Sequence, residues 1–251
     1  MASANGDSNI NKRALAKTTV RAIVTSLLFY LPVTIKFTGL FILAAIMDKE
    51  LSSKKYKALT KISSGDFKAF LYDCDGTLAD NMGAHKESYI RVAADDGYVI
   101  EGDIIDEFAG LPILNVVGEI NKRYNTTFDP TDFAARKHQI FFSEYIEKTQ
   151  PIEYVVNHLI NHAGKVRIGV VSGGSRNSVQ KTLEVLGIAH LVEVLICAGE
   201  TTHGKPYADP FLAAAQQLGV EPRHCLVFED GEPGVQAAEA AGMQWVRIDK
   251  V

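Results

Sequence analysis

Two aspartates separated by one residue, Asp73 and Asp75, are the side chains in this sequence best placed to do chemistry together. The first ends the apolar run 68–73 and the second follows it, so both carboxylates can face one site where a strand passes into a loop and its regular pleat ends. One carboxylate can attack as a nucleophile while the other transfers a proton, and a metal ion can offset their mutual repulsion. A plain acidic turn is the alternative interpretation, because Asp and Gly are common turn residues.

A serine and two glycines end a second apolar run, at Ser172, Gly173 and Gly174. A hydroxyl group and exposed backbone amides that lead into a helix N-terminus form a natural phosphate-binding loop. A capped loop without a ligand is the alternative interpretation of the same residues.

Charged residues complete the candidate site further along the chain. Lys205 lies in a Gly-Lys-Pro turn, and Glu229 and Asp230 end another apolar run. A lysine can neutralise both a phosphoryl group and the carboxylate that receives it. Carboxylates are hard oxygen ligands, which suit Mg²⁺ better than Zn²⁺.

The elements that must position these residues alternate between apolar runs and helical stretches. The apolar runs, which we interpret as buried strands, are 68–73, 166–172, 191–197, 225–230 and 245–248. The helical stretches between them are 176–186, 210–218 and 234–241. This alternation predicts an α/β fold with a mostly parallel sheet, helices on both faces and ligands beyond the carboxyl ends of the strands.

The interval from about Met82 to Pro151 interrupts that alternation. Its helical stretches are 86–95, 103–108, 113–124 and 132–148, with no convincing strand. We predict a small helical domain inserted at about 82–150 into a main domain that spans 65–251. Arg136 and Lys137, in the last of these stretches, fit a solvated helix face better than a substrate contact.

Residues 1–64 form an N-terminal extension with a hydrophobic segment at about 22–47, which contains Lys36 and Pro32. As a helix that rises about 1.5 Å per residue, the segment is long enough to cross a bilayer core of about 30 Å, although Lys36 is costly there. We expect a single membrane anchor, a pair of helices broken at Pro32 or Gly39, or a helical extension packed on the main domain. A slight excess of lysines after the segment favours a cytoplasmic main domain.

The composition sets wider bounds. The 251 residues, 47% of them hydrophobic, suffice for one sizeable α/β domain and an accessory element. A net charge of −4 gives no electrostatic reason to expect nucleic acid as a partner. Three cysteines, Cys74, Cys197 and Cys225, cannot all pair, and we interpret them as buried, reduced thiols in a cytosolic compartment.

In this order, the four motifs resemble those of the haloacid dehalogenase superfamily of aspartyl phosphotransferases. The motifs are the Asp-x-Asp-Gly-Thr-Leu run at 73–78, the strand-end serine at 172, the Gly-Lys-Pro run at 204–206 and the acidic, alanine-rich run at 228–242. The resemblance covers roughly Phe67 to Val251. It implies a Rossmann-like parallel sheet with an inserted helical cap, Mg²⁺ as the cofactor and a small phosphate ester as the substrate.

The resemblance also implies roles for individual residues. Asp73 would attack phosphorus to form an aspartyl phosphate, and Asp75 would protonate the leaving oxygen and then activate water. The implied substrate- and phosphate-binding residues are Thr77, Ser172, Gly173, Gly174, Lys205 and His85. The implied Mg²⁺ ligands are Asp73, the backbone carbonyl of Asp75, Asp230 and Glu229.

Within the superfamily, the helical insertion and the Phe-Glu-Asp ending resemble the β-phosphoglucomutase-like branch, which includes small sugar-phosphate phosphatases. His85 stands where this branch often has a histidine at the cap hinge, and we expect it either to couple cap closure to Asp75 or to face solvent on a helix. Mutases resemble one another in a Gly-Val-Ser-Arg segment that reads a second phosphate. Here the segment is Gly110-Leu111-Pro112-Ile113, without an arginine.

That difference favours a phosphatase that hydrolyses a small phosphomonoester, expected to be a sugar phosphate, through an aspartyl-phosphate intermediate. A phosphosugar mutase of the β-phosphoglucomutase type is the first alternative. A catalytically inactive regulatory protein, tethered to a membrane through residues 22–47, is the second.

Overall fold

The computed structural model describes residues 33–108 and 111–251 of the chain. Two compact units meet inside helix α2 (Val33–Ile62), one comprising Met1–Ser53 and the other Lys54–Val251. The second unit contains all the strands that the structure describes. The predicted domain boundary near residue 64 stays a prediction.

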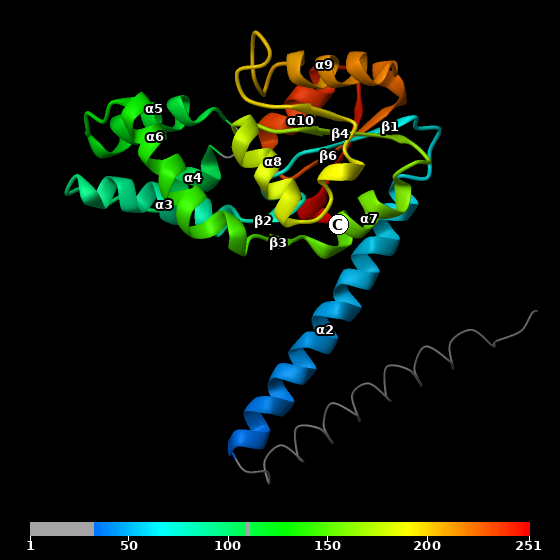
Figure 1. Ribbon diagram of the computed structural model, residues 1–251, viewed down its shortest axis with the longest axis horizontal. Coiled ribbons are helices and arrows are strands. Elements are labelled where there is room, and N and C mark those ends of the chain that lie inside the picture. Colours follow the sequence, from blue (N-terminus) through cyan, green and yellow to red (C-terminus); the bar gives the residue numbers. More distant parts are fainter. Residues whose placement is uncertain (1–32, 109–110) are drawn as a thin grey trace, which may run out of the picture. The chain divides into compact units, whose positions relative to one another are not determined.

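A five-stranded parallel sheet forms the centre of the second unit, in the order β5-β4-β1-β6-β7 (Figure 1). Its strands are β1 (Ala69–Tyr72), β4 (Arg167–Val171), β5 (Val194–Ile196), β6 (Cys225–Glu229) and β7 (Gln244–Arg247). The apolar side chains of β1 are buried on both faces, as expected for the central strand of a parallel sheet. The predicted parallel sheet is confirmed, and each predicted strand is present. Four strands are shorter than predicted, most of all β5, and β7 begins one residue earlier.

Helices cover both faces of this sheet. On one face, Tyr72 and Phe228 of the strands pack in one core cluster with residues of α7 (Glu153–His162) and α8 (Arg176–Val185). On the other, Leu71 and Val227 pack with residues of α9 (Asp209–Leu218) and α10 (Glu232–Ala240). Alternate residues of each strand thus point to opposite cores. Helix α7 was not among the predicted helices.

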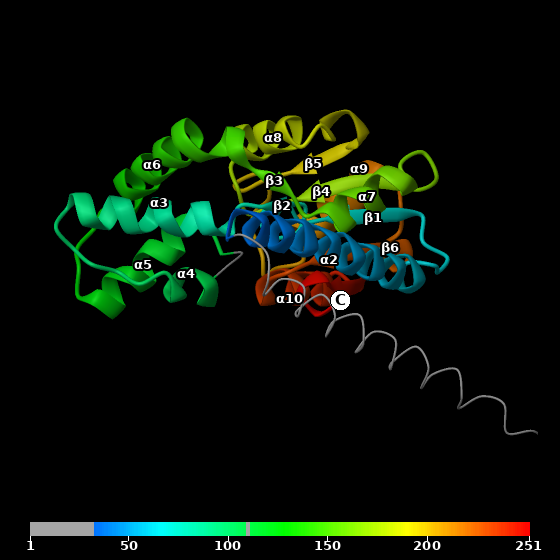
Figure 2. The same cartoon turned by 90° about the horizontal axis from the view of Figure 1, so that it is seen from below.

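A group of helices lies to one side of the sheet (Figures 1 and 2). In the sequence, these helices stand between strand β2 (Ala79–Asp80) and strand β3 (Gln150–Pro151). The helices of this cap are α3 (Met82–Asp95), α4 (Asp103–Glu107), α5 (Ile113–Tyr124), α6 (Pro130–Ile140), the π-helix η1 (Phe141–Tyr145) and the 3₁₀ helix η2 (Ile146–Lys148). They have their own apolar core, which includes Val92, Ile120 and Phe133. Strands β2 and β3 pair antiparallel at the entrance to the cap, and neither strand was predicted.

Three short 3₁₀ helices complete the elements of the second unit: η3 (Ala189–Leu191), η4 (Pro222–His224) and η5 (Ile248–Lys250). The three cysteines are buried and unpaired, as predicted.

The predicted hydrophobic segment at about 22–47 lies only partly within the described residues. Among residues 33–108 and 111–251, no helix is both long and apolar enough to cross a membrane, so the predicted membrane anchor and hydrophobic helix at about 22–47 are not supported. The described part of the segment, 33–47, is followed by Asp48, Lys49 and Glu50 within the same helix. Residues 22–32 of the segment lie outside the described residues.

Candidate active site

The site forms where the three central strands of the sheet end. Strand β1 lies between β4 and β6, so the residues that follow these strands share one edge. Asp73 follows β1, Ser172 follows β4, Glu229 is the last residue of β6, and Asp230 follows it. After β1 the chain adds β4 and β5 on one side of this strand and then β6 and β7 on the other. The edge beside β1 is therefore a topological switch point, where α/β sheets bind ligands.

Lys205 reaches this edge from the loop between β5 and α9 and is 5% exposed. Its ammonium group donates hydrogen bonds to Asp73 Oδ1 at 2.6 Å, to Glu229 Oε1 at 2.6 Å and to the carbonyl oxygen of Val171 at 2.9 Å. Burial alone would lower the pKa of Lys205, but the charges of Asp73 and Glu229 raise it above its ordinary value. The lysine is therefore a fixed, protonated cation beside the predicted nucleophile.

Glu229 is 3% exposed, and both of its carboxylate oxygens are already engaged. Oε1 accepts from Lys205, and Oε2 accepts from the backbone amides of Asp230 and Gly231 at 2.9 Å each. A Cβ atom at Gly234 would lie 1.8 Å from Glu229 Oε1, so glycine is required where α10 passes this carboxylate. Glu229 thus fixes both Lys205 and the turn that leads into α10.

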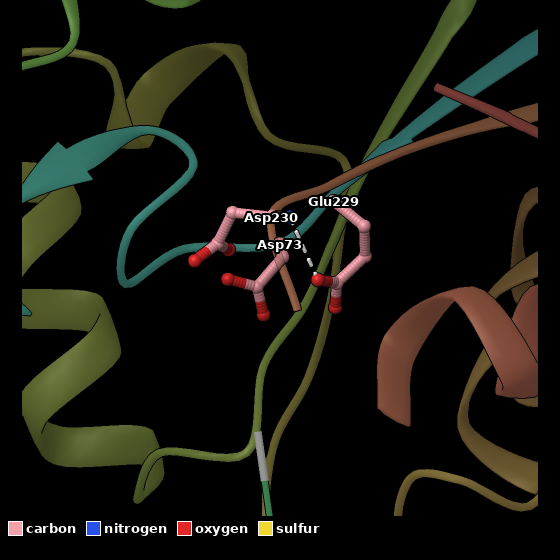
Figure 3. A group of neighbouring side chains, drawn as sticks. All are labelled: Asp73, Glu229 and Asp230. Carbon is pink, nitrogen blue, oxygen red and sulfur yellow. Dashed lines mark hydrogen bonds between the residues drawn. The ribbon is translucent and has the colours of Figure 1, made fainter. Parts of the chain in front are cut away.

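Asp230 turns its carboxylate toward Asp73 (Figure 3). Thr77 Oγ1 donates a 2.8 Å hydrogen bond to Asp230 Oδ1, which ties the loop after β1 to the end of β6. Gly76 has a φ of +84°, and a Cβ atom there would lie 2.3 Å from Asp230 Oδ2. Glycine therefore satisfies both the left-handed turn and the close approach of the carboxylate.

The donor set of these carboxylates fits a divalent cation. Asp73, Glu229 and Asp230 each offer an oxygen, and the three oxygens lie within 4.8 Å of one another. Burial raises the pKa of Asp73 well above its ordinary value, and the charges of Glu229 and Asp230 add to this although Lys205 opposes it. Burial, with the charge of Glu229, also raises the pKa of Asp230 to about 6. Lys205 alone leaves net negative charge here, and hard oxygen donors in this number suit Mg²⁺.

Asp75 has a different set of partners, from the start of the cap. Asn81 Nδ2 donates a 2.6 Å hydrogen bond to Asp75 Oδ1, and His85 Nε2 lies 3.4 Å from the same oxygen. Lys137 Nζ lies 2.6 Å from His85 Nδ1. Burial raises the pKa of Asp75, but His85 and the hydrogen bond from Asn81 outweigh it and bring the value to about 2. The Asp75 carboxylate is therefore ionised and oriented at neutral pH.

The loop after β4 presents the predicted phosphate-binding groups. Ser172 is 6% exposed, and its hydroxyl oxygen accepts the backbone amide of Gly174 at 3.0 Å. A Cβ atom at Gly174 would lie 3.4 Å from Asp75 Oδ2, so this loop passes close to the second aspartate. The loop continues into α8, and its Ser172, Gly173 and Gly174 line the same cavity as Asp73 and Asp75.

That cavity has a volume of about 460 Å³ and lies between the strand ends and the cap. Of the predicted site residues, Asp73, Asp75, His85, Ser172, Gly173, Gly174, Glu229 and Asp230 line it. Lys205 and Thr77 lie behind this lining, bonded to Asp73 and Asp230 respectively. His85 faces the cavity rather than solvent, because it stacks on Phe141 with ring centroids 4.0 Å apart.

Sequence reasoning missed two members of the site. Lys137 is not on a solvated face as predicted: it is 9% exposed and lines the cavity, whereas its neighbour Arg136 pairs with Asp96 on the surface. Successive helix residues differ by about 100°, so one of two adjacent cations can turn inward. Asn81 carried no signal beyond its position six residues after Asp75.

The strand-end carboxylates, the buried lysine and the helical cap define an α/β enzyme of the phosphatase kind. Residues 67–242, most of the chain, match the haloacid dehalogenase-like hydrolases, and the chain belongs to that family. The predicted resemblance is thereby confirmed.

Several relatives with curated names are phosphatases. The chain is 28% identical over 182 residues to fructose-1-phosphate phosphatase YqaB of Escherichia coli (strain K12), a match that covers 72% of this chain and 96% of the relative. It is 25% identical over 185 residues to a phosphorylated carbohydrates phosphatase of Thermotoga maritima, covering 70% of this chain and 82% of the relative. The predicted enzyme class is confirmed.

A solved β-phosphoglucomutase of Clostridium difficile has the same fold, with a TM-score of 0.62 and 24% identity. The superposition covers 71% of this chain and 83% of that one.

Proposed function

We propose that this protein is a Mg²⁺-dependent phosphatase that hydrolyses small phosphomonoesters, with sugar phosphates as the substrate class. The observation that carries the proposal is that Asp73 and Asp75 open on one cavity, with Lys205 bonded to the first and Asn81 to the second. Phosphoryl transfer depends mostly on positioning and on charge neutralisation, and this arrangement supplies both.

In the first step, an Asp73 carboxylate oxygen forms a bond to phosphorus while the bond between phosphorus and the ester oxygen breaks. Asp75 gives a proton to that ester oxygen, which leaves as an alcohol. Because the resting Asp75 is ionised, it must first take this proton from solvent, once the negative charge of the bound phosphoryl group has raised the pKa of Asp75. Ser172 and the amides of Gly173 and Gly174 are assigned to the phosphoryl oxygens.

In the second step, Asp75 takes a proton from water, and the water oxygen bonds to phosphorus as the bond to Asp73 breaks. This step returns Asp73 to its carboxylate form and releases inorganic phosphate. Lys205 stays bonded to Asp73 and offsets negative charge beside it. We assign His85 and Lys137 to the orientation of Asp75.

We assign the metal to Asp73, Asp230 and the backbone carbonyl of Asp75. When bound there, Mg²⁺ would neutralise charge on the phosphoryl oxygens. Glu229, the further Mg²⁺ ligand that the resemblance implies, lies in the same carboxylate group, but its two oxygens are taken by Lys205 and by backbone amides. We therefore assign Glu229 to the positioning of Lys205.

The assignment to sugar phosphates rests on the curated relatives, whose names include a fructose-1-phosphate phosphatase, a phosphorylated carbohydrates phosphatase and a hexitol phosphatase. A mutase is the alternative, supported by the fold likeness to β-phosphoglucomutase. The phosphatase is preferred because Leu111, Pro112 and Ile113 occupy the cap segment that carries an arginine in the mutases.

The test is phosphate release by the full chain from a panel of hexose, pentose and hexitol phosphates, with Mg²⁺ and then with excess EDTA. We expect release that requires Mg²⁺. Isomerised sugar phosphate that forms only after a bisphosphate is added would identify a mutase instead. No turnover under either condition would contradict an enzymatic role.

A further inference from the structure

The cavity above the catalytic aspartates has two unlike walls. The wall contributed by α4, α5 and the segment between them is apolar in every described side chain that lines the cavity; these are Ile105, Phe108, Leu111, Ile113 and Val116. The wall contributed by the start of α8 is polar, with Ser175, Asn177 and Ser178. A ligand in this cavity would therefore meet hydrocarbon on the cap side and hydrogen-bonding groups on the sheet side.

The charges around the cavity are also uneven. Four carboxylates line its floor, at Asp73, Asp75, Glu229 and Asp230. Among the described lining residues, Lys137 supplies the ammonium group, and no arginine is present.

Lys137 is not positioned to serve the apolar wall. Its ammonium group lies 2.6 Å from His85 Nδ1 and over the rings of Tyr89 and Phe141, at 5.3 Å and 5.2 Å from their centroids. Through His85 it belongs to the chain of contacts that ends at Asp75. His138 also lines the cavity, and burial together with the charge of Lys137 lowers the pKa of its imidazole. Among the described lining residues, no cation is therefore left to pair with a second anionic group of a ligand.

We propose that the substrate's alcohol part is electrically neutral, with its carbon-bound face against the apolar wall of α4 and α5 and its hydroxyl groups toward Ser175, Asn177 and Ser178. This inference rests on the proposed phosphatase function. It narrows the substrate class to monophosphates whose alcohol part carries no charge, which excludes bisphosphates and phosphorylated carboxylic acids. A carboxylate or second phosphate against that wall would lose its water without gaining a partner, which is strongly unfavourable.

The experiment compares kcat/KM of the full chain for substrate pairs that differ in charge. Glycerol 3-phosphate is paired with 3-phosphoglycerate, and fructose 1-phosphate with fructose 1,6-bisphosphate. We expect kcat/KM to be at least about tenfold higher for glycerol 3-phosphate and fructose 1-phosphate, whose alcohol parts carry no charge. The reason is that an unpaired buried charge costs more than one factor of ten in binding. Equal rates, or a preference for the anionic member, would overturn the inference.

A cation placed in the wall gives the second test. Ile113→Arg should reduce the ratio of kcat/KM between the two members of each pair by at least about tenfold, because the guanidinium would pair with the second anionic group of the substrate. Leu114→Arg is the matched control, since Leu114 is the next residue of α5, is 48% exposed and does not line the cavity. The control should keep the wild-type preference.

Leu111→Arg, in the segment before α5, repeats the test if Ile113→Arg lowers the melting temperature. If both wall variants are folded and neither changes the preference, the assignment of this wall to the alcohol part is wrong. Acetyl phosphate separates this failure from that of the proposed function, because its small leaving group tests the catalytic residues alone. If acetyl phosphate is hydrolysed but esters with an anionic alcohol part are preferred, the inference is wrong. If no substrate is hydrolysed, the proposed function itself is wrong.

Discussion

Lys205 Nζ lies 2.6 Å from Asp73 Oδ1, although 132 positions separate the two residues in the sequence. The contact joins the end of the central strand to the loop that follows the edge strand β5. It forms away from water, with side chains that are 2% and 10% exposed. A second carboxylate, that of Glu229 at the end of β6, binds the same ammonium group. Strand β6 lies next to β1 in the sheet.

This double pairing predicts that Lys205 contributes to both stability and activity. Lys205→Met should leave two buried carboxylates without their cation, so the free energy of unfolding should fall by about 3–5 kcal/mol. Phosphate release should fall at least about a thousandfold, since the charge beside the nucleophile is lost. Urea unfolding and steady-state assays of the full chain measure the two effects.

Lys181→Met is the matched control for that variant. Lys181 forms an exposed ion pair with Glu147, with side chains 32% and 69% exposed, and such pairs contribute only about 0–1 kcal/mol. If Lys205→Met is no less stable than this control, the buried pairing does not stabilise the fold as argued.

Asp230 is expected to determine metal affinity. Asp230→Asn should raise the Mg²⁺ concentration for half-maximal phosphate release at least about a hundredfold, because loss of a metal ligand costs more than loss of a residue that orients one. Titration calorimetry with Mg²⁺ alone gives a readout that does not depend on turnover. Glu232→Gln, at a carboxylate 65% exposed near the start of α10, should bind Mg²⁺ like the wild type. Unchanged Mg²⁺ affinity in Asp230→Asn would remove Asp230 from the metal site.

A buried histidine predicts how stability depends on pH. His158 is fully buried, with its ring nitrogens 2.8 Å from the Tyr72 hydroxyl and 2.7 Å from the Ser63 hydroxyl. Burial, with the charge of His162, lowers the pKa of His158 to about 3, below the value of about 6.5 for an unfolded histidine. Between pH 6.5 and 3 the unfolded chain therefore binds the extra proton, and stability should fall as the pH falls through this window.

The contribution of one such group is at most about 1.4 kcal/mol per pH unit. His158→Gln should flatten the dependence of the unfolding free energy on pH between 7 and 5, measured by urea unfolding. Its absolute stability should also fall, because the ring stacks on Phe70. The exposed His190→Gln is the control. An identical slope in His158→Gln and wild type would contradict the account.

The sequence was sufficient to predict the strands and the residues that end them, because a buried parallel strand is a short apolar run and its functional residue follows directly. It could not specify that β1 lies between β4 and β6, because strand order depends on how the whole chain crosses over. The convergence of Asp73, Ser172 and Asp230 therefore came from family resemblance and not from periodicity.

The features that reasoning from sequence missed have separate physical causes. Lys137 and Arg136 are adjacent cations of one helix, and the turn of the helix alone decides that the first enters the cavity. The helix α7 contains Val155 and Val156, and β-branched residues are not typical of helices. The packing of that helix on the sheet overrides this local preference.

The central claim is that Asp73 forms the covalent bond to phosphorus. For a direct measurement, the full chain is mixed with Mg²⁺ and a phosphomonoester that it hydrolyses, and the reaction is quenched in acid. Reduction with borohydride then converts an aspartyl phosphate into homoserine. Peptide mass spectrometry then locates the modified position. Asp73→Asn, which should be folded but without turnover, is the control, and it should show no homoserine at residue 73. We predict homoserine at position 73 in the wild type; homoserine at another aspartate, or turnover that persists in Asp73→Asn, would contradict the mechanism.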